Sequence, residues 1–128
     1  MNTRNRTDAK RRAVSYSTDG GETWSEPAYV DALPDPICQA AMLRVPNPKD
    51  ILLFSNAASA SRDTLTVRLS RDGGRTWNAG RCLHEGPAAY SCLVALTETT
   101  AACLYECGEE SPYERIVFTR FPVVWVER

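Results

Sequence analysis

The chain has 128 residues, a formal net charge of −1 and a hydrophobic fraction of 43%, values that indicate one folded domain, or part of one, with a core to bury. The near-neutral charge offers no general attraction to nucleic acid, and no apolar run reaches the roughly 18 residues of a membrane-spanning helix. No secretory signal is visible at the N-terminus.

The first twelve residues are polar and basic, with five Lys or Arg and one Asp. Three interpretations stay open for them: a solvated hairpin arm, a nucleic-acid or targeting arm, and a ligand-binding role for Arg4. The second is the least favoured, because no aromatic residues interleave with the basic ones for base stacking.

Two copies of the pattern S-x-D-G-G-x-T-W organise the chain. Ala13–Ser17, a β-like run, precedes the first copy at Ser17–Trp24, and Thr64–Ser70 precedes the second at Ser70–Trp77. The Asp carboxylate can accept hydrogen bonds from nearby backbone N–H groups, and the glycines adopt positive φ without steric cost. Each copy therefore predicts a hairpin with a capped turn, under which its Trp packs.

Short apolar runs alternate with turn residues over the rest of the chain. Two prolines mark residues 32–36 as a linker, and a Gly-Pro pair marks residues 85–90 as a turn. Arg68 and Arg120 lie in the middle of expected strands, and we expect their side chains to face outward. The other expected strands are a return strand ending at Tyr29–Val30, then Cys38–Val45, Ile51–Phe54, Arg81–Leu83, Ser91–Leu96, Ala101–Glu106, Arg115–Phe121 and a last short edge at Val123–Val126.

Several short strands at regular turn spacing predict an all-β fold. The two copies of the pattern are 53 residues apart (70 minus 17), close to the repeat length of propeller blades. The pattern resembles the Asp-box, or BNR repeat, of sialidases and related β-propellers. This resemblance implies part of a six-bladed β-propeller: about two and a half antiparallel four-stranded blades within one domain, roughly at 1–31, 37–84 and 90–126. In that family the box lies on the outer rim, so it indicates fold and leaves function open.

Three loops at strand ends carry residues suited to binding or chemistry. The first is 1–5 with Arg4, the second runs from 54 to Arg62, and the third is 86–91 with Tyr90, which is followed by Glu106 on a later strand.

The order of motifs from Arg4 to Phe121 resembles the C-terminal part of an exo-α-sialidase (neuraminidase): an arginine, F-S-N, a second arginine, the Asp-box, G-P-x-x-Y-S, L-Y-E and R-I-x-F. The resemblance implies a glycoside hydrolase that releases terminal sialic acid from sialylated glycoconjugates with retention. It assigns Tyr90 as the nucleophile, places Arg4 and Arg62 in a clamp for the sugar carboxylate, and makes Glu106 the carboxylate that positions the first arginine of that clamp.

Elementary chemistry supports each residue type. Guanidinium groups bind a carboxylate through paired, charge-assisted hydrogen bonds. Sialic acid carries its carboxylate on the anomeric carbon, where it would repel an anionic Asp or Glu nucleophile but not a neutral Tyr. A phenol with a pKa near 10 needs a neighbouring base to attack near neutrality.

Each residue also has a plain structural interpretation. Tyr90 could begin a strand with its ring in the core, Arg62 could be an ordinary loop arginine, and Glu106 could pair with Arg115 across a hairpin. Other N-terminal arginines compete with Arg4 for its place in the clamp: Arg6, Arg11 and Arg12.

Three elements of the family have no counterpart in the chain: the first clamp arginine, the aspartate acid/base, and the glutamate that activates the tyrosine. Because Met1 also stands directly before the Asn-x-Arg match, we expect a fragment or a late-started reading frame. We expect the chain alone to be inactive or nearly so. Half a ring exposes blade faces and strand edges, so we also expect marginal stability, self-association, or both.

Two other functions remain open. A non-catalytic Asp-box propeller, acting as a binding or assembly module, would not need Arg62, Tyr90 and Glu106 to converge. A pseudoenzyme would bind sialic acid without turning it over.

No cluster in the sequence implies a metal or an organic cofactor. The five cysteines lack CxxC spacing and the histidine is single. An odd number of cysteines favours free, mostly buried thiols, which are typical of a reducing compartment such as the cytoplasm; the sequence does not otherwise indicate a location.

Overall fold

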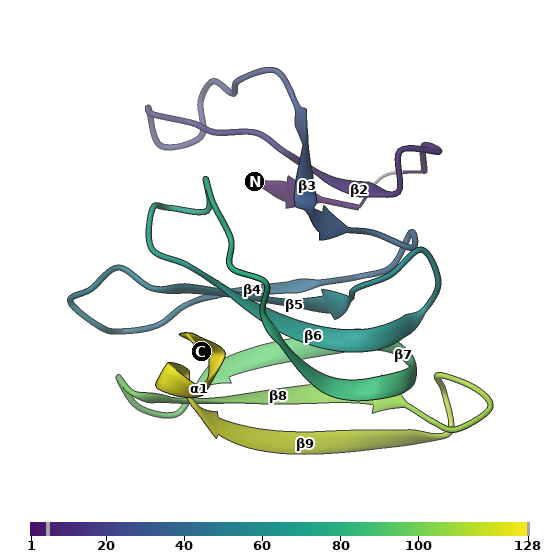
Figure 1. The fold of residues 1–128 in the computed structure, drawn as a ribbon. Coiled ribbons are helices and arrows are strands. Elements are labelled where there is room, and N and C mark those ends of the chain that lie inside the picture. Colours follow the sequence, from purple (N-terminus) through teal and green to yellow (C-terminus); the bar gives the residue numbers. More distant parts are fainter. Residues whose placement is uncertain (5, 128) are drawn as a thin grey trace.

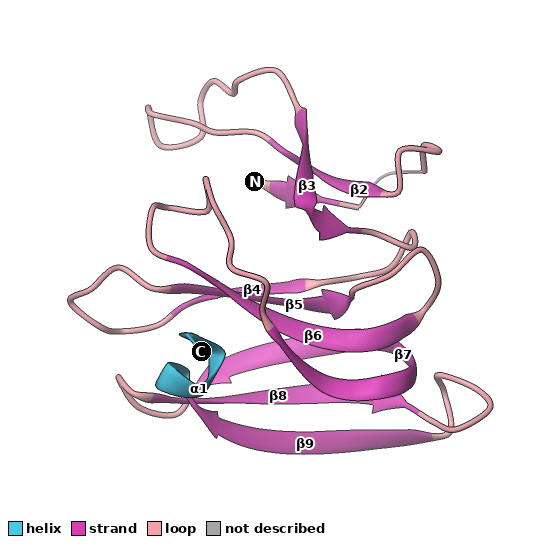
Figure 2. Cartoon of the chain, viewed as in Figure 1, coloured by secondary structure: helices cyan, strands magenta, loops and turns pink. Residues whose placement is uncertain are grey.

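The computed structural model describes residues 1–4 and 6–127, and in this part of the chain β-strands dominate. The strands are β1 (Asn2–Thr3), β2 (Arg11–Val14), β3 (Ala28–Pro34), β4 (Ala41–Arg44), β5 (Leu52–Ala57), β6 (Asp63–Ser70), β7 (Arg81–Ala95), β8 (Thr100–Cys107) and β9 (Arg115–Pro122). One short helix, α1 (Val123–Glu127), follows β9 (Figure 2). None of the described helical structure is long and apolar enough to cross a membrane.

The strands form antiparallel sheets stacked one on another (Figure 1). The N-terminal sheet has the order β1-β2-β3, and the remaining strands follow in chain order from β4 to β9. The first half of β7 pairs with β6 and its second half with β8. We therefore call β4 to β7 the middle sheet and β7 to β9 the C-terminal sheet. Stacked antiparallel sheets in chain order are the arrangement of β-propeller blades, so the expected all-β, partial propeller is confirmed.

The middle sheet is covered on both faces, and β5 shows why. Each of its six residues is buried, as expected for a central strand with a layer on either side. Leu53 belongs to the apolar core shared with the C-terminal sheet. Phe54 points the other way: its ring packs at 5.6 Å from that of Trp77, and the guanidinium of Arg12, on β2, lies 5.8 Å from it.

Both Asp-boxes form the expected capped turns, one between β2 and β3 and one between β6 and β7. Asp72 accepts hydrogen bonds from the backbone N–H of Thr76 at 2.9 Å and from its hydroxyl at 2.6 Å. The Trp77 indole donates to the Gly74 carbonyl at 3.1 Å, and Gly74 has a φ of 86°. The first box repeats these contacts, although Trp24 remains 47% exposed.

The Tyr16 hydroxyl, beside the first box, donates to the carbonyl of Gly74 in the second at 2.9 Å. Boxes in two sheets are thereby joined. Because Arg62 directly precedes β6 and the second box follows it, the box and the expected site lie at opposite ends of one strand.

Two predicted breaks are absent from the structure. The Gly86-Pro87 pair does not form a turn, because β7 continues through it while changing partner from β6 to β8. Proline has no backbone N–H to donate to a neighbouring strand. It is tolerated at this point because β7 changes partner there and does not need that donor. Residues 32–34, expected in a linker, extend β3, and a register shift lets Pro34 pair with Arg11.

Other local expectations are also wrong. Val123–Val126 is helical rather than an edge strand, because the buried pair Val123 and Val126 shares one face at a spacing of three residues. Among the three interpretations of the N-terminal residues, a hairpin is present, because β1 pairs antiparallel with β2, but Arg12 in β2 is buried rather than solvated. Arg68 is buried and donates to Asn56, whereas Arg120 is exposed as expected.

The cysteines are free thiols in the structure, and the buried ones are Cys38, Cys103 and Cys107, while Cys82 and Cys92 are exposed.

Candidate functional site

Three of the four predicted site residues lie at one end of the middle and C-terminal sheets. Arg62 directly precedes β6, Tyr90 lies within β7, and Glu106 lies near the end of β8. The backbone joins them, because the Ala88 N–H donates to the Arg62 carbonyl at 2.9 Å and Ala88 pairs with Cys107 on β8. These strand positions, far apart in the sequence, therefore become neighbours.

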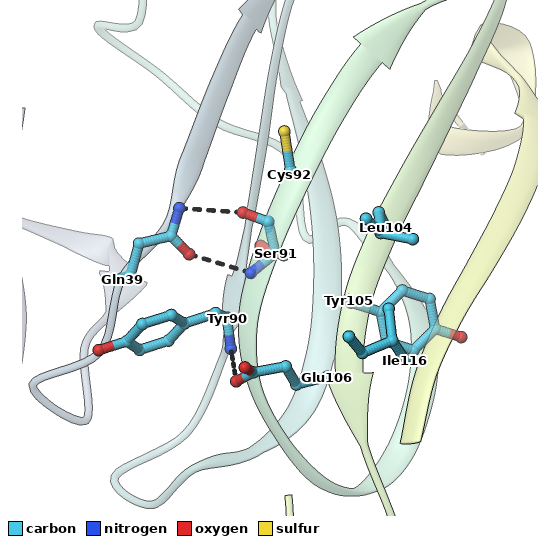
Figure 3. Close-up of a pocket in the computed structure, with 8 residues that line it drawn as sticks. All are labelled: Gln39, Tyr90, Ser91, Cys92, Leu104, Tyr105, Glu106 and Ile116. Atoms are coloured by element: carbon cyan, nitrogen blue, oxygen red, sulfur yellow. Dashed lines mark hydrogen bonds between the residues drawn. The ribbon is translucent and has the colours of Figure 1, made fainter. Parts of the chain in front are cut away.

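Tyr90 lies in a β-bulge. Ala88 pairs with Cys107 and Ser91 pairs with Tyr105, so two residues of β7 lie opposite the single residue Glu106 of β8. The Tyr90 N–H donates to the Glu106 carboxylate at 3.1 Å (Figure 3). A bulge turns a side chain away from the regular strand alternation. The Tyr90 side chain is accordingly exposed, at 43% for the residue, between nearly inaccessible neighbours, so its ring is not in the core.

Arg62 contacts two aromatic side chains. Its guanidinium lies over the Tyr90 ring, 5.7 Å from the centroid, within the range of a cation–π contact. Its Nη1 donates to the hydroxyl of Tyr113, and its Nη2 donates to the Ile37 carbonyl at 3.3 Å. Sequence reasoning did not single out Tyr113; its only signal was an aromatic residue in the otherwise polar loop between β8 and β9.

Arg4 follows β1 and is exposed. Burial raises the pKa of the Cys38 thiol, and the positive charges of Arg62 and Arg4 oppose that rise. Both arginines are thus within electrostatic range of one buried residue. Asn5, which completes the predicted motif, lies outside the described residues.

The arginines that competed with Arg4 differ in their surroundings. Arg12 is buried: its Nη1 lies 3.4 Å from the Asp35 carboxylate, and its Nε donates to Asn2 at 2.7 Å. Arg11 forms an ion pair with Asp31 at 3.6 Å, and Arg6 is exposed. Arg12 therefore belongs to the core between sheets rather than to an open site.

An open cavity of about 350 Å³ adjoins Tyr90 (Figure 3). Tyr90, Glu106 and Gln39 line one side, and Leu104 and Ile116 form an apolar wall on the other; the Tyr90 hydroxyl points away from that wall (Figure 3). The remaining lining residues are Ser91, Cys92 and Tyr105. Gln39 was not predicted from the sequence; its amide forms two hydrogen bonds with the Ser91 backbone.

The arrangement combines a cation, a phenol and a carboxylate beside an open cavity. Such a site suits a small anionic, hydroxyl-rich ligand, because Arg62 offers charge-assisted donors and the aromatic rings offer flat contact surfaces. Within residues 1–4 and 6–127, no group of three His, Cys, Asp or Glu side chains is arranged to hold a metal ion.

Comparisons with known proteins indicate the family and the fold of the chain. The family model of the BNR repeat-like domain matches residues 1–103. A sialidase of Micromonospora viridifaciens is 36% identical over 135 aligned positions, which cover 98% of this chain and 20% of that protein.

Among solved structures, the similar chains are also sialidases or trans-sialidases. The Hadza microbial sialidase Hz136 superposes with a TM-score of 0.82 at 34% identity, covering 98% of this chain and 25% of that one. The intramolecular trans-sialidase from Ruminococcus gnavus, solved with oseltamivir carboxylate, has a TM-score of 0.73 at 21% identity over 93% of this chain and 29% of its own; this second likeness concerns the fold alone. The chain spans about a fifth to a quarter of the length of the first two proteins.

Proposed function

Because this chain belongs to the BNR-repeat family of sialidases, we propose that it supplies part of the substrate site of an exo-α-sialidase. The reaction proposed is release of terminal sialic acid from a sialylated glycoconjugate, with retention of configuration at the anomeric carbon.

One observation supports the proposal above the others: Arg62, Tyr90 and Glu106 converge. The Arg62 guanidinium lies over the Tyr90 ring, and the Tyr90 backbone is bonded to Glu106. A non-catalytic assembly module has no need of that convergence, whereas a site for an anionic sugar requires a cation beside its nucleophile.

The proposed roles follow from the chemistry of the groups. Arg62, together with Arg4, binds the sugar carboxylate by charge-assisted hydrogen bonds. The Tyr90 oxygen attacks the anomeric carbon as the bond to the aglycone oxygen breaks, and water then cleaves the resulting tyrosyl ether bond to release sialic acid. We assign neither the acid nor the base of this reaction to a residue of this chain, so we expect little or no turnover from the 128 residues alone.

Carboxylate recognition is tested by an NMR titration of the chain with free N-acetylneuraminic acid. We expect saturable binding to the wild type that is lost in Arg62→Ala and partly kept in Arg62→Lys, because lysine retains the charge but not the planar pair of donors. The methyl ester of the sugar is the matched control ligand. Equal binding of the ester and the acid would contradict the clamp.

The nucleophile is tested by release of a fluorogenic aglycone from a sialoside, with Tyr90→Phe as the control. Any turnover by the wild type should disappear in Tyr90→Phe, which removes only the attacking oxygen. Turnover that survives this change would exclude Tyr90 as the nucleophile.

A further inference from the structure

Gln39 lies just before β4, and its side chain reaches across to the backbone of β7. Its Nε2 donates to the Ser91 carbonyl at 2.9 Å, and its Oε1 accepts from the Ser91 N–H at 2.9 Å (Figure 3). Two such bonds with one residue are what an antiparallel neighbouring strand makes at a hydrogen-bonded pair. The Gln39 amide thus replaces a strand at this edge of β7.

The contact matters because Ser91 is buried, at 4% exposure, and its backbone groups point away from β8. Buried backbone N–H and C=O groups without partners destabilise a fold. The Ser91 hydroxyl is also held, at 2.8 Å from that of Ser55 on β5. On the β8 side, the Glu106 carboxylate accepts a hydrogen bond from the Tyr90 N–H. Side chains therefore hydrogen-bond to the backbone of the bulge at both edges of β7.

The segment that carries Gln39 holds Arg62 as well. The carbonyl that accepts from Arg62 belongs to Ile37, whose φ of 60° is unusual for a β-branched residue. That conformation is stabilised from the buried side, where the Asp35 carboxylate accepts from the Cys38 N–H at 3.0 Å and contacts Arg12. Backbone strain of this kind tends to occur at functional sites.

We propose that Gln39 is a positioning residue, which fixes the bulge so that the Tyr90 ring stays under the Arg62 guanidinium. The segment 35–39 then sets the relative placement of both groups, through Ile37 for Arg62 and through Gln39 for Tyr90. The importance of this placement rests on the proposed function; the contacts themselves do not.

The experiment is an NMR hydrogen-exchange measurement on the 128-residue chain and its Gln39→Leu variant. Leucine has a similar size and makes neither bond. We expect the Ser91 amide to exchange about tenfold faster in Gln39→Leu, the factor that corresponds to one net hydrogen bond. The amides of Leu53 and Leu65, in the core, should keep their rates. The Tyr90 ring contacts with Arg62, followed as nuclear Overhauser effects, should weaken in the same variant.

Asn47→Leu is the matched control. Asn47 also carries an amide that bridges distant segments, donating to the Glu98 carbonyl at 2.9 Å, and its loss should leave Ser91 and Tyr90 unchanged. Gln39→Glu keeps the acceptor for the Ser91 N–H and removes the donor. It should give an intermediate rate, and it supplies a second variant if Gln39→Leu does not fold.

Gln39 is the only glutamine of the chain, so selective labelling reports its side-chain amide as a single NH₂ group. Unchanged Ser91 exchange in folded Gln39→Leu would overturn the proposal. So would retained contacts between Tyr90 and Arg62 despite faster exchange, since Gln39 would then seal an edge without positioning the ring. These readouts need neither sugar nor turnover, so they stand apart from a failure of the proposed function.

Discussion

At the scale of single residues, the Asp-box sequence directly affects the pKa of its aspartate. Hydrogen bonds from the Thr76 hydroxyl and backbone, then from the Ser70 hydroxyl, lower the pKa of Asp72 to about 2. In the first box, bonds from the side chain and backbone of Thr23 lower the pKa of Asp19 in the same way. A carboxylate that accepts several such bonds favours its charged form.

This shift predicts a pH dependence of stability at Asp72. The folded pKa lies below the unfolded value of about 3.9, so the contribution to stability is present above about pH 4 and is lost as the pH falls towards 2. Asp72→Asn should be less stable than the wild type at pH 6, and the difference should shrink between pH 4 and pH 2. Urea unfolding across this range measures it, with Glu85→Gln outside the box as control. A constant difference at every pH would contradict the prediction.

The buried ion pair predicts a larger effect. Burial lowers the pKa of the Arg12 guanidinium, and Asp35 opposes that shift. Asp35→Ala leaves a buried arginine without its partner and should lower the free energy of unfolding by about 3–5 kcal/mol. Glu109→Ala, which removes the exposed partner of Arg115, should lower it by less than about 1 kcal/mol. Similar losses in chemical denaturation would refute the distinction.

At the scale of elements, β7 connects the fold to the site. It leaves β6 for β8 near Pro87 and then forms the bulge that exposes Tyr90. The sheets on either side of this crossing share an apolar core, to which β5 and β6 contribute Leu53, Leu65 and Val67. The bulge is therefore supported by this shared core as well as by the hydrogen bonds of Gln39 and Glu106.

Leu65 tests that support. It is inaccessible to solvent and lies in the shared core, so Leu65→Ala should lower the free energy of unfolding by about 2–5 kcal/mol through lost burial and a cavity. Leu96→Ala, at an exposed position, should change it far less. Equal effects in thermal unfolding would mean that the two sheets do not share a cooperative core.

At the scale of the whole molecule, the C-terminal sheet has an uncovered outer face. Leu104 pairs directly with Cys92 on one side and Phe118 on the other, so these side chains share a face, and Ile116 and Val94 lie on the same side. All five residues are exposed. The opposite face packs on the middle sheet, as one propeller blade packs on the next. Open apolar faces of this kind favour association.

We therefore expect the chain to self-associate through this face. Phe118→Lys places a charge at its centre and should lower the average mass in sedimentation velocity at micromolar concentration. Val124→Lys, at an exposed position on α1, is the control. A wild-type chain that sediments as a monomer at every concentration would exclude the prediction.

The sequence by itself determined what depends on neighbours along the chain. The paired Asp-boxes predicted capped turns, and the short runs between them predicted an all-β propeller fold; both are confirmed. The hydrogen bonds of such a turn join residues within about four or five positions of one another, so the eight-residue motif is enough to specify the turn. Tyr90, Arg62 and Glu106 were chosen by motif resemblance, and their roles remain proposals.

The tertiary structure decided whatever depends on contacts between distant segments. Gln39 meets Ser91 across 52 residues and Arg62 meets Tyr113 across 51, and no local pattern encodes either pair. The same limit explains the wrong predictions at Gly86-Pro87 and at α1. Local propensity favoured a turn and a strand there, but pairing with β8 and burial of Val123 and Val126 favoured a continuous strand and a helix. Packing free energy from the whole fold outweighs the preferences of a few residues.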